Sequence, residues 1–221
     1  MRSAGPPHVL GLMLLTGLAL TVVVPYHPEL NNPNEHVRVY MSAAMAEEGS
    51  YRIDGMRRRW GWTNDAACVE VQDDGQLTAC EGRRSRNERR FYSVKAPGLS
   101  FLGALPYALA VDDAAAWGLP RIVWMLRLTC VVFPMLLFLG FFLRFLRREE
   151  TAPGLAEVVF LAVALGSPFL GYSLLFVSHS PGAAAAFGAF ALLVGRRRET
   201  APGGARGLGR AAIAGGLAAG A

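Results

Sequence analysis

Hydrophobic residues gather in blocks along this chain, and strongly charged or polar stretches separate the blocks. Apolar runs cover residues 9–25, 122–146, 156–177 and 181–195, and a further run begins at 208 and continues to 221. A helix needs about 20 mostly apolar residues to cross the hydrocarbon core of a bilayer. The pattern therefore predicts an all-α integral membrane helical bundle of about five spans, with the start of the fifth at 208–221.

The first apolar run, residues 9–25, admits two interpretations. Its length and the preceding Arg2 are compatible with a signal peptide. However, the stretch LALTVVVPYHPEL offers no convincing small-x-small cleavage site, and Pro25 follows the apolar residues directly. An uncleaved first span is therefore favoured, with residues 1–8 as the N-terminal tail.

Residues 26–121 form the longest polar section, which we expect to be a large extracytoplasmic loop with short helices and a small β-hairpin. One stretch within it, 97–111, is moderately apolar, but it is short for a span and contains Pro97 and Pro106. We interpret this stretch as an interfacial or re-entrant helix at the membrane surface.

The arginines indicate which side of the membrane each connection faces. Outside the long polar section, which weighs little in this rule, and apart from Arg127 within an apolar run, they occur at residue 2, at 144–148 and at 196–210, whereas the short turn at 178–182 has none. Because basic residues favour the cytoplasmic side in short connections, we expect a cytoplasmic N-terminus and a cytoplasmic loop at 196–207. Lys95 is the single lysine, and the excess of arginine, alanine, glycine and proline is typical of a high-GC bacterial genome. We therefore expect a multi-pass protein of the bacterial inner (plasma) membrane.

The formal net charge of +5 and the sequence pI of about 9.5 would also fit a nucleic-acid-binding protein. The arginines, however, lie beside the apolar blocks and do not form a basic face on a folded domain. Membrane lipids, and not nucleic acid, are therefore the expected partners.

Two cysteines in the polar section flank a predicted β-hairpin. Val69 and Val71 alternate with polar residues, and Asp74-Gly75 follows as a turn signal between Cys68 and Cys80. A disulfide between these cysteines is plausible in an oxidising compartment, which is where the predicted topology places the loop. The alternative is a pair of unrelated free thiols.

A short helix is predicted immediately after the first apolar run. Asn34 is a suitable N-cap, and Gly49 is a natural stop. Glu35 would then lie in the first turn, where the helix dipole stabilises a carboxylate, and this is a sufficient structural reason for an acid there. The functional alternative makes Glu35 a general base or a metal ligand. An apolar stripe is expected at Val37, Tyr40, Met41, Ala44 and Met45.

Cations near the membrane surface are candidates for binding phosphate. Lys95 lies beside Tyr92 and a Pro-Gly turn, and such groups can bind a lipid phosphate or pyrophosphate. A solvated loop against anionic headgroups is the plainer alternative. Arg127 lies within the run 122–146, so it should face a polar cavity or extend towards the membrane surface. Pro134, in the same run, predicts a kink.

Taken in order, these features resemble the N-terminal part of the multi-spanning glycosyltransferases that use polyprenyl-phosphate-linked sugars. This superfamily includes protein O-mannosyltransferases and the lipid A aminoarabinose transferase. The stretch NEHVRVYMSAAMAEEGSYRID is similar in position to the segment that carries their catalytic acid, here Glu35. FYSVKAPGLSFLGALPYAL resembles the end of their first loop, with Lys95 and Pro97, and WMLRLTCVVFPMLLFLGFFLRFLRR resembles their second span, with Arg127. LGSPFLGYSLLFVSHSPGAAAA looks like their following span and turn.

The resemblance implies transfer of a sugar from a polyprenyl-phosphate donor to an extracytoplasmic acceptor. Glu35 would be the catalytic base or a metal ligand, and Lys95, Arg127 and Tyr92 would hold the donor phosphate, with a divalent cation as a further aid. The cysteine-bounded hairpin and the arginine-rich loop depart from the family pattern. Members also carry many more spans, so we expect this chain to be the N-terminal part of a longer protein or a truncated product.

Two other classes of protein fit the same sequence. A non-enzymatic multi-pass membrane protein would use the extracytoplasmic loop for binding or assembly, and Glu35 would then be only an acid at a helix start. A transporter would usually show internal repeats or paired broken helices, and the sequence shows no repeat. The sequence does not indicate the sugar, the acceptor or the oligomeric state.

Overall fold

The computed structural model describes residues 7–23, 32–72, 74–80, 88–110, 112, 116–149, 153–198 and 213. The chain forms two compact units. One consists of Met1–Val24 and Val131–Ala221, and the other, which we name the middle unit, consists of Pro25–Cys130. The middle unit coincides closely with the polar section 26–121 expected from the sequence.

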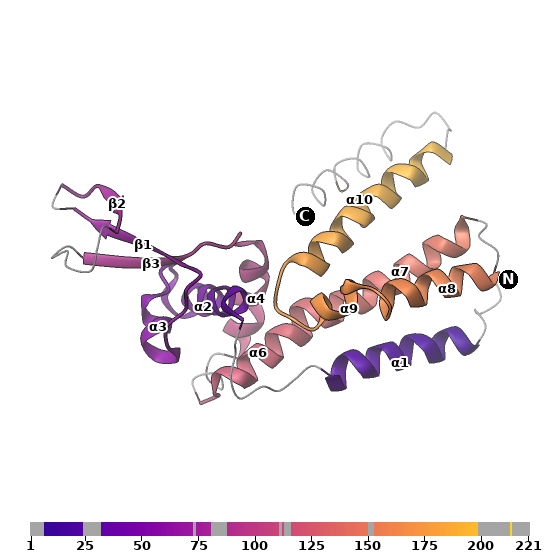
Figure 1. Cartoon of the computed structure of the whole chain (residues 1–221), viewed down its shortest axis with the longest axis horizontal. Helices are drawn as coiled ribbons and strands as arrows, with labels where there is room; N and C mark the ends of the chain where they lie inside the picture. Colours follow the sequence, from indigo (N-terminus) through magenta and orange to yellow (C-terminus); the bar gives the residue numbers. More distant parts are fainter. Residues whose placement is uncertain are drawn as a thin grey trace. The chain divides into compact units, whose positions relative to one another are not determined.

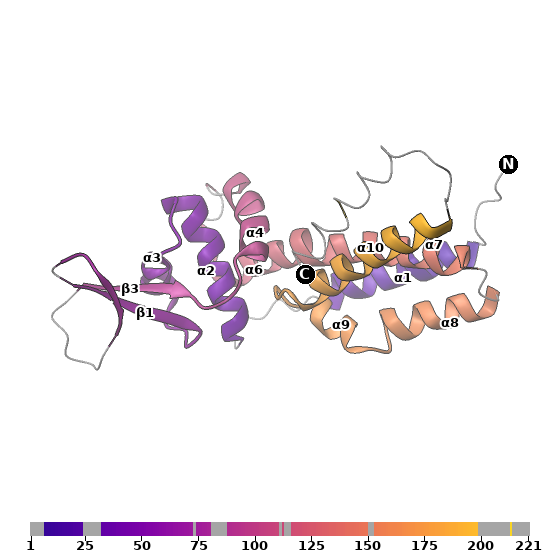
Figure 2. The same ribbon diagram turned by 90° about the horizontal axis from the view of Figure 1, so that it is seen from above.

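The middle unit combines helices with a small antiparallel sheet (Figures 1 and 2). Strand β1 lies at the centre of the sheet, in the order β2-β1-β3. Helix α2 packs chiefly against α4, and α3 contacts both α2 and β3. The elements are α2 (Pro33–Glu48), α3 (Asp54–Trp60), β1 (Ala66–Val71), β2 (Leu77–Ala79), β3 (Glu88–Ser93), α4 (Gly98–Leu109) and α6 (Leu119–Arg127).

The N-cap of helix α2 lies two residues earlier than predicted. Asn32, and not Asn34, is the N-cap, because the Asn32 side chain accepts a hydrogen bond from the Asn34 backbone N–H over 3.1 Å. Pro33 follows at the first helical position, where its missing N–H costs nothing. The helix ends at Gly49, which adopts the left-handed conformation (φ 59°) as the sequence predicted. Burial extends well beyond the predicted apolar stripe, so α2 is the central helix of the unit.

The predicted hairpin is present as strands β1 and β2. Val69 lies opposite Ala79 and Val71 lies opposite Leu77 in antiparallel register. Gly75 takes a positive φ of 82° at the turn, which a residue without a Cβ adopts at little cost. Cys68 and Cys80 are joined by a disulfide, which closes the open end of the hairpin.

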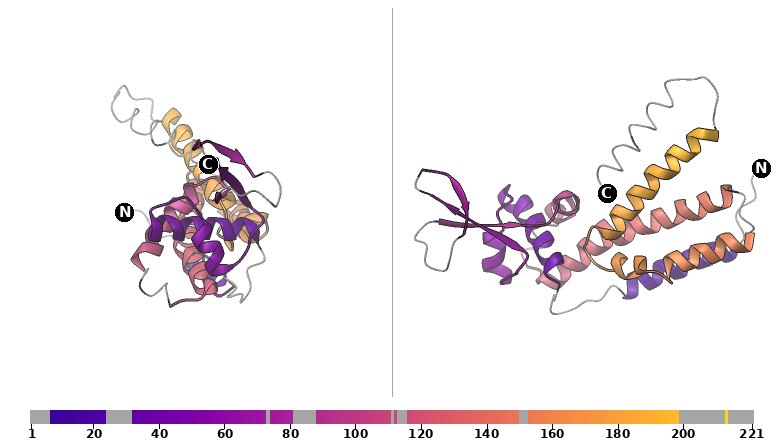
Figure 3. Two further views of the ribbon diagram at one scale, coloured as in Figure 1. Left: turned by 90° about the vertical axis from the view of Figure 1, so that its left-hand side faces the viewer. Right: turned by 45° about the horizontal axis from the view of Figure 1, so that its top comes forward.

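The other unit is helical in its described residues (Figure 3). Helix α7 contacts α1, α8 and α10. Leu139, Phe142 and Leu143 of α7 form a buried cluster with Phe160 and Ala164 of α8. The ring of Phe187 lies edge-on to Phe142 and Phe145, with centroids 5.2 Å apart in each case. The helices are α1 (Pro7–Val23), α7 (Phe133–Arg148), α8 (Pro153–Ala164), α9 (Pro168–Ser173) and α10 (His179–Arg198).

The expectation of about five membrane spans is wrong for the described residues. Among them, a single helix, Leu119–Arg148 with 30 residues, is long and apolar enough to cross a membrane, and it contains the predicted run 122–146. Helix α1 has 17 residues. At 1.5 Å per residue such a helix is about 26 Å long, short of the roughly 30 Å hydrocarbon core. The predicted start of a fifth span at 208–221 lies outside the described residues, apart from residue 213.

The predicted third and fourth spans fail for local reasons. Helix α8 ends at Ala164, and Ser167 then caps a new helix, α9, by accepting a hydrogen bond from the Phe169 N–H over 3.1 Å. Pro168 has no N–H and disfavours a helical residue before it, so the run 156–177 is interrupted. Helix α10 covers 181–195, but it begins with polar residues, is rich in alanine and glycine, and ends in three arginines.

The long helix 119–148 contains an irregular turn where the sequence predicted a kink. Residues Leu128–Val132 form a π-helical turn between α6 and α7, which ends two residues before Pro134. A proline removes one helical hydrogen bond and crowds the preceding turn. The wider π turn is a common accommodation of such a disruption. Arg127 is the last residue before this turn.

Candidate functional site

The side chains of Glu35 and Arg127 meet inside the middle unit. Arg127 Nε donates a hydrogen bond to Glu35 Oε1 over 2.7 Å, and a terminal guanidinium nitrogen donates to Oε2 over 2.6 Å. Both carboxylate oxygens therefore accept from one planar guanidinium, which is the strongest common geometry for such a pair. The Glu35 side chain is 0% exposed and that of Arg127 is 4% exposed.

Local structure positions each member of this pair. Glu35 is the third residue of α2, in the first turn, and its backbone N–H donates to the Asn32 carbonyl over 3.0 Å. The positive end of the helix dipole therefore acts on the Glu35 carboxylate together with the guanidinium. Arg127 ends α6. Of the two placements left open for Arg127 by the sequence, the structure has the inward one, with Glu35 as the group it contacts.

The burial of the pair makes it sensitive to the loss of either member. Removing two charges from water is costly, and their mutual attraction with two good hydrogen bonds offsets that cost. Loss of one partner leaves an uncompensated buried charge, which typically costs about 3–5 kcal/mol. A substitution of Glu35 should therefore affect both the stability of the middle unit and any chemistry that Glu35 carries out.

Arg38 is a second buried cation that the sequence analysis did not single out. It lies one turn after Glu35 on α2 and is 5% exposed. One of its terminal nitrogens donates to the Ala96 carbonyl over 3.1 Å, which ties α2 to the segment before α4. Burial lowers the pKa of the Arg38 guanidinium, and the charge of Asp65 partly opposes this shift. The i, i+3 spacing from Glu35 is the sequence signal that could have found it.

Lys95 and Tyr92, the other predicted phosphate ligands, lie on neighbouring parts of the unit. Lys95 Nζ is 3.1 Å from Asp65 Oδ2, and both side chains are about one quarter exposed. Tyr92 belongs to β3, where it lies opposite Ala67 and also forms a bridge with Arg52. Lys95 is therefore linked to Arg38 through Asp65 and Ala96, whereas Tyr92 is part of the sheet.

Helix α4 presents two different faces. Leu99, Ser100, Gly103 and Tyr107 are buried, and the Ser100 hydroxyl donates to the Arg38 carbonyl over 3.1 Å. The opposite face carries large exposed apolar side chains. Their exposed fractions are 51% for Phe101, 61% for Leu102, 67% for Leu105 and 82% for Leu109. This is the segment for which the sequence predicted an interfacial helix at 97–111.

Arg127 pairs with Glu35 and Lys95 pairs with Asp65, while Arg38 adds a further cation one turn after Glu35 on α2. Cationic side chains of this kind can bind a phosphate. Both oxygens of the Glu35 carboxylate accept hydrogen bonds from the Arg127 guanidinium. No group of three or more metal-ligating residues occurs in the described part of the chain.

Comparisons with protein-family models, with curated proteins and with solved structures find no match for this chain. The resemblance stated from the sequence is therefore carried by the quoted motifs alone.

Proposed function

We propose that the chain is a membrane glycosyltransferase, or the N-terminal part of one, that moves a sugar from a polyprenyl-phosphate donor to an acceptor outside the cytoplasm. The observation that carries the proposal is the buried pair of Glu35 and Arg127, which places a carboxylate and a guanidinium in contact. A carboxylate is suited to accept a proton from an acceptor hydroxyl, and a guanidinium is suited to bind a phosphate.

In this proposal the donor phosphate separates the pair. A phosphate oxygen takes the place of the Glu35 carboxylate on Arg127, and Glu35 becomes available as a base. The acceptor oxygen then attacks the anomeric carbon of the sugar while Glu35 takes the hydroxyl proton. The bond between that carbon and the phosphate oxygen breaks, and the polyprenyl phosphate leaves with its electron pair. The cation lowers the energy of the departing anion.

Arg38 and Lys95 support the same chemistry. Both are cationic, and both are tied to the segment at Ala96 and to Asp65. Arg38 lies one turn after Glu35 on α2, so it would be a second cation for a phosphate that takes the place of Glu35 on Arg127. Cations near the phosphate stabilise the negative charge that develops on it as the bond to the sugar breaks.

Two apolar features support a location at the bacterial inner membrane. Helix 119–148 has the length and composition of a membrane span. The exposed face of α4 has the character of a helix that lies in the lipid interface, where apolar side chains enter the acyl region. A polyprenyl donor is membrane-bound, so an enzyme acting on it needs such contact.

The test is a transfer assay with radiolabelled polyprenyl-phosphate sugars and the purified protein at its native full length. Glu35→Gln should lower kcat by at least about 100-fold, because it removes the general base. Glu48→Gln is the matched control, since it removes a carboxylate at the other end of α2. Full transfer by a folded Glu35→Gln protein would exclude Glu35 as the base. Absence of transfer from every donor, by folded wild-type protein, would overturn the enzymatic proposal.

A binding or assembly role is the second candidate. The disulfide-closed hairpin favours it, because β2 is an edge strand whose Leu77 is 59% exposed. Edge strands can pair with a strand of another protein. If no transfer is found, crosslinking from Thr78→Cys, with the hairpin disulfide intact, would show whether a partner binds at this edge.

A further inference from the structure

A separate pocket of about 320 Å³ lies beside α3 in the middle unit. We name it the α3 pocket. Two arginines and two aromatic residues dominate its lining, and the remaining residue is an aspartate. The lining residues are Asp54, Arg57, Arg58, Trp62 and Phe91. None of them belongs to the site proposed above.

Arg57 is held in place but is incompletely satisfied. Its guanidinium carbon lies 3.6 Å from the centroid of the Phe91 ring, which is a close cation–π contact. Its Nε is buried and has no hydrogen-bond partner within the part of the chain that the structure describes. Burial also lowers the pKa of this guanidinium, with the charge of Asp54 partly opposing the shift. An anionic ligand would add negative charge beside this guanidinium and accept hydrogen bonds from its N–H groups.

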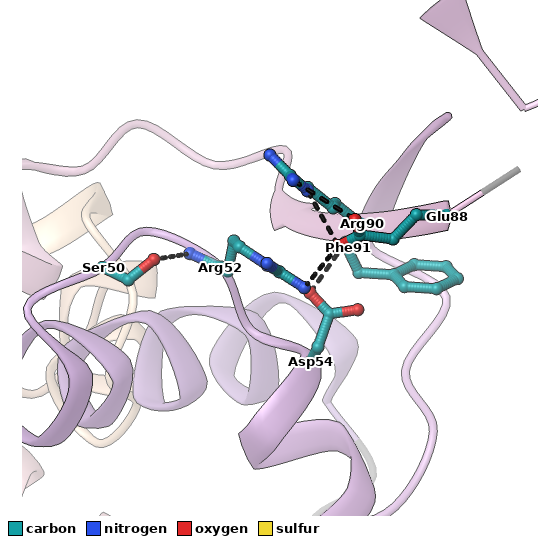
Figure 4. Close-up of polar contacts among 6 residues, drawn as sticks. All are labelled: Ser50, Arg52, Asp54, Glu88, Arg90 and Phe91. Carbon is teal, nitrogen blue, oxygen red and sulfur yellow. Dashed lines mark hydrogen bonds and ion pairs between the residues drawn. The ribbon is translucent and has the colours of Figure 1, made fainter. Parts of the chain in front are cut away.

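The carboxylate in the pocket is already engaged elsewhere. Asp54 Oδ2 accepts a hydrogen bond from the Phe91 backbone N–H over 3.1 Å and one from Arg52 Nε over 3.4 Å (Figure 4). Glu88 is likewise paired with Arg90 and Arg52, at 3.1 and 3.4 Å. Because Arg52 balances Asp54 and Arg90 balances Glu88, the charges of Arg57 and Arg58 remain as a net positive charge at the pocket.

The aromatic side chains add an apolar wall to this positive charge. Trp62 is 71% exposed, so most of its indole surface is available for contact with a ligand. Large exposed aromatic side chains are frequent in binding sites, because they supply contact area at low entropic cost. Phe91 contributes a second ring, which also holds Arg57. The pocket thus combines an anion site with a stacking surface.

We propose that the α3 pocket binds a phosphate group attached to an apolar or aromatic body. Arg57 and Arg58 hold the phosphate, and Trp62 contacts the organic part. The same chemistry is found in a lipid headgroup and in a free phosphomonoester. The inference is independent of sugar transfer, and its test uses probes without a sugar.

Binding is measured by isothermal titration calorimetry on the purified full chain in neutral detergent micelles. The probes are inorganic phosphate, phenyl phosphate, and micelles doped with phosphatidylglycerol or with phosphatidylcholine. The expected result is saturable binding of phenyl phosphate or of phosphatidylglycerol. Arg57→Gln and Arg58→Gln should each weaken it at least about tenfold, the effect of losing one charge-assisted hydrogen bond. Binding of the free ester assigns a soluble ligand, and binding of the doped lipid alone assigns a headgroup.

Controls separate the pocket from general charge and from misfolding. Arg121→Gln removes one charge from an exposed position of the same unit and should leave binding unchanged. Trp62→Ala should weaken phenyl phosphate but not inorganic phosphate. Far-UV circular dichroism verifies that each variant is folded. The proposal is overturned by equal losses in Arg57→Gln and Arg121→Gln, by insensitivity of every probe to Trp62→Ala, or by the absence of saturable binding to folded wild-type protein.

Discussion

Glu35 and Arg127 are 92 residues apart in the sequence, yet their side chains share two hydrogen bonds of 2.6 and 2.7 Å in the interior of the middle unit. Glu35 lies in the first turn of the central helix α2, and Arg127 ends α6. The pair therefore links two elements of the unit and supplies both a base and a cation to the candidate site.

The first prediction concerns the stability contributed by this pair. Glu35→Gln or Arg127→Gln alone should lower the free energy of unfolding by about 3–5 kcal/mol, because each leaves a buried charge without its counterion. The double variant Glu35→Gln/Arg127→Gln should be considerably less destabilised than the sum of the single changes. Denaturant unfolding of the four proteins measures the coupling. Additive losses would show that the two side chains do not depend on each other.

A second prediction concerns the exposed face of α4. A cysteine at Leu105, labelled with an environment-sensitive fluorophore in a Cys130→Ala background, should report an apolar environment in lipid vesicles. Its emission should shift to the blue and be quenched by lipid-attached quenchers, because the side chain enters the interface. The matched control is a labelled cysteine at Asp74, on the hairpin turn, which should report water. Water-like emission from position 105 would contradict an interfacial α4.

A third prediction concerns alkaline pH. Burial, together with a hydrogen bond to Glu47, raises the pKa of Tyr107. Because the folded state then holds this proton more tightly than the unfolded state, the stabilisation is complete below pH about 10 and decreases as the pH rises above it. Unfolding measured between pH 9 and 11 should show this decline, and Tyr107→Phe should reduce it. Tyr51→Phe, at an exposed position, should leave the decline unchanged. An unaltered slope in Tyr107→Phe would assign the decline to other groups.

A fourth prediction concerns the disulfide of the hairpin. Reduction, or the double change Cys68→Ser/Cys80→Ser, should lower the free energy of unfolding by about 2–4 kcal/mol, because the closed loop restricts the unfolded chain. Unfolding with and without a reductant measures the difference. The double variant serves as the control, since the reductant should not change its stability. Equal stability of oxidised and reduced wild-type protein would show that the hairpin is not part of the cooperative unit.

Several elements could be predicted because their signals are local. Gly49 ends α2, since a left-handed residue favours glycine. Asp74-Gly75 marks the hairpin turn, and the apolar run 122–146 lies within the long helix. The predicted number of spans was wrong, in part because apolar composition does not show where a helix is interrupted, as the run 156–177 is at Ser167-Pro168.

The sequence by itself thus determined helix and strand segments whose turn residues, caps and apolar runs act over a few positions. Only the tertiary structure decided the partners of the charged residues. Glu35 and Arg38 are next to α4 and α6 because α2 is buried nearly all round, and an apolar stripe does not reveal that. A buried charge must find a counterion or a hydrogen-bond partner, but which one it finds depends on how distant segments pack together.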